Sequence, residues 1–121
     1  MSKIIAVDPA KYGFSINRDL SVSQMEFKPG PPETVDGVSV GFVTMTESPP
    51  HGGERHPDGD EILYVISGKV KIIGDSSPAI ELGRGDACIV EKGEWHRVEV
   101  LEETQLIYIT PGPNSDYRPM G

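Results

Sequence analysis

The order of apolar and polar residues along the chain predicts many short β-strands. Residues 20–27 alternate between two faces, and residues 38–46 are rich in β-branched side chains, which favour strands. Turn signals such as Ser67-Gly68 separate the closely spaced apolar segments that follow. The predicted strands are 3–7, 20–27, 38–46, 61–66, 69–73, 79–82, 87–90, 95–101 and 104–109. Because no window supports an amphipathic helix of several turns, this spacing indicates an all-β antiparallel sandwich or barrel.

Two of the predicted strands are apolar on both faces, namely 62–66 and 106–109. A barrel wall turns only one face to its core, so the other face needs a cover. The N-terminal segment, a second subunit or both could supply it, and we expect a homodimer; the alternative is that some of these side chains are simply exposed. The tail 110–121 is rich in Pro and Gly, so it is predicted to be irregular.

Length and composition fit a single domain over residues 1–121. The formal net charge of −8 argues against non-specific binding to nucleic acid or to an anionic membrane. The single cysteine, Cys88, cannot form an internal disulfide, and the N-terminus resembles neither a signal peptide nor a spanning segment. We therefore expect a cytoplasmic protein whose partner is a small molecule.

Polar residues that could carry chemistry cluster around His56. If the chain is extended there, Glu54 and His56 share one face, and a turn through 57–60 folds Glu61 back beside them. His96 opens another predicted strand. Two imidazoles and a carboxylate facing one cavity would suit iron, manganese, nickel, zinc or copper.

Other interpretations of these residues stay open. A histidine beside a turn is more often a surface or core residue than a ligand, and the Asp-Gly-Asp-Glu run at 58–61 is also typical of a solvated acidic turn. His51, between two prolines and two glycines, is a further candidate donor. Trp95 should face away from His96 and pack, while Cys88 lies within an apolar strand and should be inert.

Residues 52–68 and 85–100 resemble the two conserved motifs of the cupin superfamily. The first runs His-x-His, three or four residues, Glu, six residues, Gly; the second runs Gly, five residues, Pro-x-Gly, two residues, His, three residues, Asn. The residues that match are His56, Glu61, Gly68, Gly85, Gly93 and His96. The resemblance implies a small single-domain cupin, a double-stranded β-helix or jelly-roll barrel with a metal in its pocket.

The resemblance carries His56, Glu61 and His96 over as metal ligands. Glu54 stands where the family has the first His of its pair, so it is expected to be a fourth ligand or a catalytic general base. Alternatively, Glu54 pairs with an arginine such as Arg55 and metal binding is weakened or lost, or His51 reaches in from the loop. Glu91 and Val100 replace the second motif's Pro and Asn.

The function implied by the resemblance is chemistry at a divalent metal: iron, manganese, nickel or zinc. The substrate would be a small organic acid, a phenolic compound or a sugar derivative, and the reaction of dioxygenase, isomerase or lyase type. The alternative is a non-catalytic module that binds or senses a small ligand. A fold does not fix a function, so the sequence leaves both hypotheses open.

Overall fold

The computed structural model describes residues 3–28 and 34–119, and within these ranges the chain forms β-strands and no helix. Accordingly, no helix in the described ranges is long and apolar enough to cross a membrane. The strands are β1 (Tyr12–Asn17), β2 (Val22–Glu26), β3 (Gly37–Met45), β4 (Gly53–Arg55), β5 (Glu61–Gly74), β6 (Ile80–Gly83), β7 (Ala87–Val90), β8 (His96–Pro111) and β9 (Asp116–Arg118). The all-β prediction is confirmed.

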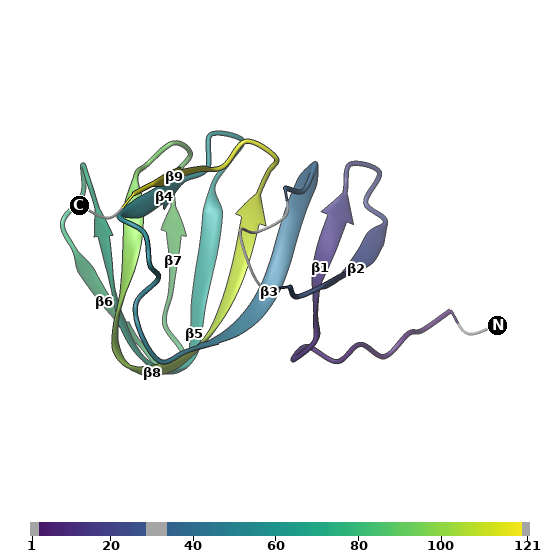
Figure 1. Cartoon of the computed structure of the whole chain (residues 1–121), viewed down its shortest axis with the longest axis horizontal. Helices are drawn as coiled ribbons and strands as arrows, with labels where there is room; N and C mark the ends of the chain where they lie inside the picture. The colour runs from purple at the N-terminus through teal and green to yellow at the C-terminus, as the bar shows by residue number, and fades with distance from the viewer. Residues whose placement is uncertain (1–2, 29–33, 120–121) are drawn as a thin grey trace.

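Two long strands, β5 and β8, form the centre of a curled antiparallel half-barrel (Figure 1). β5 also pairs with β6 and β7, while β8 also pairs with β3 and, at one end, with β4. β1 and β2 continue the sheet beyond β3 and lie to one side of the barrel (Figure 1). The curl brings β4 and the short strand β9 across the mouth of the barrel.

The core follows from the alternation of side chains along β5. Leu63 and Val65 point inward and are buried, whereas Ile62 and Tyr64, on the opposite face, are 42% and 39% exposed. Burying one such aliphatic side chain contributes about 1.5–3 kcal/mol, so this inner face stabilises the barrel. The buried cluster comprises Leu63, Val65, Val70, Ile72, Leu82, Val90 and Leu106.

Two pairs of strands predicted to be separate each form one continuous strand. The predicted strands 61–66 and 69–73 join into β5, whose pairing with β8 shifts register between Val65 and Val70. Gly68 lies at this bulge with φ +92°, and a Cβ atom there would collide with the carbonyl oxygen of Glu103. The predicted strands 95–101 and 104–109 likewise join into β8.

The ends of the chain correct three predictions. Residues 3–7 form no strand, and Ile4 and Ile5 are exposed, so this segment does not cover the barrel wall. β1 lies where we expected no strand, because its inward positions are Gly13 and Ser15 and carry no apolar signal. In the tail predicted to be irregular, β8 reaches Pro111 and β9 pairs with β4.

Candidate metal centre

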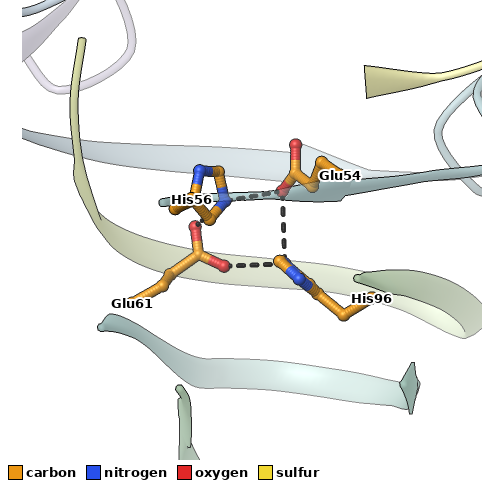
Figure 2. A group of neighbouring side chains, drawn as sticks. All are labelled: Glu54, His56, Glu61 and His96. Carbon is orange, nitrogen blue, oxygen red and sulfur yellow. Dashed lines mark hydrogen bonds and ion pairs between the residues drawn. The ribbon is translucent and has the colours of Figure 1, made fainter. Parts of the chain in front are cut away.

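Four side chains converge at the mouth of the barrel: Glu54, His56, Glu61 and His96 (Figure 2). Each offers one oxygen or nitrogen atom, and these atoms all lie within 4.8 Å of one another. Figure 2 shows the two carboxylates and the two imidazoles pointing toward a common centre. The structure therefore brings together the four residues that the sequence singled out, and their role as metal ligands stays a prediction.

Backbone pairing explains why residues distant in sequence meet here. Glu54 on β4 is the register partner of His96 at the start of β8. His56 follows directly after β4, and the turn through 57–60 brings Glu61, the first residue of β5, back beside it. The site thus stands where three strands begin or end, and the barrel fold holds its residues in place.

The donor atoms form close oxygen–nitrogen pairs. Glu61 Oε1 lies 3.0 Å from His96 Nε2, and Glu61 Oε2 lies 3.2 Å from His56 Nε2. Glu54 Oε1 is 3.5 Å from both Nε2 atoms. Glu61 is 2% exposed, His56 4% and His96 3%, whereas the Glu54 side chain is 23% exposed. Three of the donors are therefore sealed, and Glu54 faces the opening.

Each sealed residue also has a partner on its outer side. The Nδ1 of His96 lies 3.0 Å from the carbonyl oxygen of Glu94, which can only accept, so Nδ1 carries the proton. The Nδ1 of His56 lies 2.7 Å from the Ser115 hydroxyl. The hydroxyl of Thr110 donates to Glu61 Oε2 at 2.5 Å. Such outer contacts orient ligands in metal sites.

These contacts test whether the residues suit a metal ion. With Nδ1 protonated, a neutral His96 ring would turn the lone pair of Nε2 toward the oxygens of Glu54 and Glu61. A proton or a metal ion is therefore needed between this nitrogen and the two oxygens. Among the described residues, His56 Nε2 is the buried side-chain atom without a hydrogen-bond partner. A proton or a divalent metal ion can fill that place, and two imidazoles with two carboxylates are ligands that such ions prefer.

The charges of the cluster shift the pKa values of its members strongly. Burial alone would lower the pKa of each histidine, but the close carboxylates of Glu54 and Glu61 outweigh it and raise the pKa of His56 to about 9 and of His96 to about 10. Burial would likewise raise the pKa of the carboxyls. The two histidines outweigh it, lowering the pKa of Glu54 to about 2 and that of Glu61 below its ordinary value. Without metal, the cluster is a pair of imidazolium ions facing a pair of carboxylates.

A cavity of about 400 Å³ adjoins the cluster. Its walls near the site are largely apolar, and two phenol groups also face it. Burial and the nearby carboxylates raise the pKa of Tyr117 to about 12 and raise that of Tyr108, so both phenols stay protonated. The lining residues near the site include Val43, Met45, Leu63, Leu106, Tyr108 and Tyr117.

His51, the remaining donor candidate, lies outside the four-residue group. Its Nδ1 accepts the backbone N–H of Gly53 at 3.2 Å, and its Nε2 is 3.9 Å from Glu54 Oε2. Its ring packs edge-on against Tyr117. His51 therefore contacts the outer oxygen of Glu54 and does not reach the centre of the cluster.

The alternatives raised by the sequence are resolved by other contacts. Arg55 pairs with Asp116 at 2.8 Å and not with Glu54. Trp95 packs against arginines, as expected for a packing residue. Asp60 accepts the backbone N–H of Lys92, so the acidic turn serves the backbone while Glu61 turns inward.

Sequence reasoning missed the side chains that contact the outer sides of the cluster residues. Thr110 and Ser115 lie at the end of β8 and in the tail, and no motif or periodicity marks them. Tyr108 shares the inner face of β8 with Leu106, so strand alternation could have pointed to it. Its ring lies over Gly41, where a Cβ atom would collide with the phenol.

Solved structures with the same fold include small single-domain proteins. A protein from Neisseria meningitidis is 17% identical, with a TM-score of 0.53, and the match covers 71% of this chain and 88% of the other. A cupin-2 domain protein from Shewanella frigidimarina is 23% identical, with a TM-score of 0.55 and coverage of 73% and 85%. Oxalate decarboxylase from Bacillus subtilis is 22% identical, with a TM-score of 0.55, and the match covers 70% of this chain but only 24% of that longer one.

Sequence comparison points to the same family. A comparison with curated proteins found no match. The family model described as a cupin domain, however, matches residues 42–111, which include all of β4, β5 and β8, and so all four residues of the cluster. The chain belongs to the cupin domain family.

Proposed function

We propose that this cupin binds a divalent transition-metal ion at Glu54, His56, Glu61 and His96 and uses it to act on a small, oxygen-bearing organic molecule. The observation that carries the proposal is the convergence of four donor atoms within 4.8 Å beside a cavity. The buried Nε2 of His56 supports it: this atom lies 3.2 Å from Glu61 Oε2 but makes no hydrogen bond, and a buried polar atom without a hydrogen bond is costly.

The donor set favours a hard ion. Two carboxylates balance the charge of a divalent ion, and carboxylate oxygens favour manganese or iron(II) over copper. Oxalate decarboxylase from Bacillus subtilis, which has the same fold, contains Mn(II) centres. When bound, the ion would polarise substrate oxygen atoms as a Lewis acid.

The protein's own groups would bind and orient the substrate. The apolar walls, among them Val43 and Leu106, would hold its carbon skeleton and exclude water. The protonated phenols of Tyr108 and Tyr117 can donate hydrogen bonds to oxygen atoms. The Glu54 carboxylate lines the cavity and is partly exposed, which places it where a general base would take a proton from a molecule in the cavity.

Metal analysis of the purified protein tests the proposal. The chain is stripped with a chelator, reloaded with manganese, iron(II), nickel or zinc in turn, and analysed for bound metal. We expect one ion per chain, and a sharp loss of occupancy in His56→Ala, Glu61→Ala and His96→Ala. The matched control is His51→Ala, which removes an imidazole that does not reach the centre and should keep its metal.

The same preparation decides between enzyme and binding module. The reloaded protein is incubated with small organic acids, phenolic compounds and sugar acids while products and oxygen consumption are followed. Turnover that requires the metal and falls in Glu54→Gln supports an enzyme. A chain that stays metal-free after reloading contradicts the proposal and favours a module that binds a ligand without turnover.

A further inference from the structure

The ring of His56 is held from outside the part of the chain that matches the cupin family model. His56 lies after the last residue of β4, and its backbone carbonyl accepts the N–H of Gly93 at 3.2 Å. On the outer side of the ring, Nδ1 meets the Ser115 hydroxyl at 2.7 Å. Ser115 lies beyond residue 111, where the family match ends.

The three sealed residues differ in where their outer partner comes from. His96 is held by the carbonyl of Glu94, two residues earlier on the same segment, and Glu61 by Thr110 on β8, both inside the matched part of the chain. His56 depends on Ser115, from the segment 114–118, which we call the C-terminal clasp. The position of one proposed ligand therefore depends on how firmly this segment is fastened.

Several contacts fasten the C-terminal clasp to strands that carry the site. Its strand β9 pairs with β4, with Tyr117 opposite Glu54. At its start, Asn114 donates two hydrogen bonds to the Asp58 carboxylate, at 2.6 and 2.9 Å, and Asp58 lies in the turn between His56 and Glu61. These bonds hold the clasp in place on the N-terminal side of Ser115.

On the C-terminal side of Ser115 the clasp is held by charged and aromatic groups. Asp116 pairs with Arg55 at 2.8 Å, and Arg118 pairs with Asp75 at 2.8 Å. The guanidinium groups of Arg55 and Arg118 lie 5.0 and 4.3 Å from the ring centroid of Trp95, which precedes His96. Single exposed ion pairs contribute little, but a connected set that shares one aromatic ring fixes a short strand more firmly.

From these contacts we infer that the C-terminal clasp is part of the metal centre, and that Ser115 is a positioning residue that accepts the Nδ1 proton of His56 and so turns Nε2 toward the ion. This inference rests on the proposed metal function. A neutral imidazole carries one proton, and a hydroxyl that accepts it at Nδ1 leaves the lone pair of Nε2 free to coordinate.

The test compares full-length variants by their affinity for Zn²⁺, measured in competition with a chromogenic chelator. Ser115→Ala should bind Zn²⁺ about 10- to 100-fold more weakly, the usual cost of losing an outer partner of a ligand. Ser115→Thr keeps the hydroxyl and should stay near wild type. The matched control is Ser48→Ala, which removes a serine hydroxyl that accepts the N–H of Val100 far from the ligands.

Nitrogen-15 NMR of the imidazole rings gives a readout that general destabilisation would not imitate. In the Zn²⁺-loaded wild type, His56 should carry its proton on Nδ1 and exchange it slowly with water, and the Ser115→Ala protein should exchange it fast. Zn²⁺ affinity in Ser115→Ala equal to that of Ser48→Ala overturns the inference. An unprotonated Nδ1 in the His56 ring of the wild type also overturns it. Because that measurement is made on the wild type, it decides the question even if Ser115→Ala fails to fold.

The two proposals fail in different ways. If the wild type takes up no metal, yet its His56 Nδ1 proton is protected by Ser115, the metal function is wrong and the positioning of the ring stands. If the wild type binds Zn²⁺ and Ser115→Ala binds it equally well, the metal function stands and the role of the clasp is wrong.

Discussion

Metal binding at neutral pH should release protons from the four-residue cluster. Without metal, the pKa values of His56 and His96, raised to about 9 and about 10, keep both rings protonated at pH 7. The lowered pKa values of Glu54 and Glu61 keep both carboxylates ionised. A divalent ion that takes the central position has to displace both imidazolium protons, so uptake of one ion should release about two protons.

The number of protons released sets the pH dependence of the metal affinity. While both rings are protonated without metal, the apparent affinity should rise roughly 100-fold per pH unit, since two protons leave for each ion bound. The slope should decrease as the pH passes about 9 and flatten above about 10, where His56 and His96 lose their protons unaided. A site of ordinary histidines would already be nearly flat at pH 8.

The stability of the metal-free protein should depend on the same groups, but with rising pH it should fall where the metal affinity rises. Because the folded pKa values of both histidines are raised, their contribution is fully present below the unfolded value of about 6.5 and is lost as the pH rises through about 9 and 10. The contribution of Glu54 is present above its unfolded value and is lost as the pH falls toward about 2. Metal-free unfolding temperatures should therefore decline from neutral to alkaline pH.

Calorimetric titration with Zn²⁺ in buffers of different ionisation enthalpy measures the protons directly. The slope of the observed enthalpy against the buffer enthalpy is the number of protons that the buffer takes up. Glu54→Gln is the informative variant, because it removes one of the two carboxylates that raise the histidine pKa values and should release fewer protons at the same pH. Release of fewer than about one proton by the wild type at pH 7 would refute the charge assignment.

Three further predictions concern the ligand set, the barrel and its outer face. Glu54→His should bind metal at least as tightly and shift the preference toward nickel, copper or zinc, whereas unchanged metal content in Glu54→Ala would remove this residue from the ligand set. Gly68→Ala should lower the free energy of unfolding by about 1–3 kcal/mol or more in denaturant titrations, and Gly85→Ala is its control, because Gly85 has a similar φ, +84°, with nothing near its Cβ position. Ile62→Lys should convert the expected homodimer to a monomer in light scattering, while Val22→Lys on β2 should not; a wild type that is already monomeric contradicts the dimer.

The expected dimer rests on apolar side chains that the sheet aligns on its outer face. Ile62 stands opposite Ile89 on β7 and Ile109 on β8, and Ile109 in turn stands opposite Val40 on β3. Ile62 and Ile89 are 42% and 68% exposed, and the N-terminal segment leaves them uncovered. The sequence predicts that these strands are apolar on both faces. It does not tell whether a second subunit packs against the outer face.

Much of the barrel and the cluster could be predicted because both depend on side-chain pattern. Alternation marks strands with one buried face, and the motif spacing places His56, Glu61 and His96. β1 was missed because close approach of the backbone requires small inward residues: a Cβ at Gly13 would lie 2.9 Å from the carbonyl oxygen of Val40. β9 was missed because its pairing with β4 is made by backbone groups, which every residue but proline offers alike.

The departure of Glu54 from the usual cupin motif falls at the most exposed member of the cluster, with 23% of its side chain exposed. The other three are sealed, so their replacement would leave buried charges without partners and disturb the protein together with the site. Glu54 places one oxygen between the two histidines and turns the other toward His51. A change at this position would therefore alter the charge that the proposed ion and substrate meet, while the sealed residues of the cluster stay in place. For this reason the Glu54 variants separate metal binding from turnover more cleanly than variants of the sealed residues.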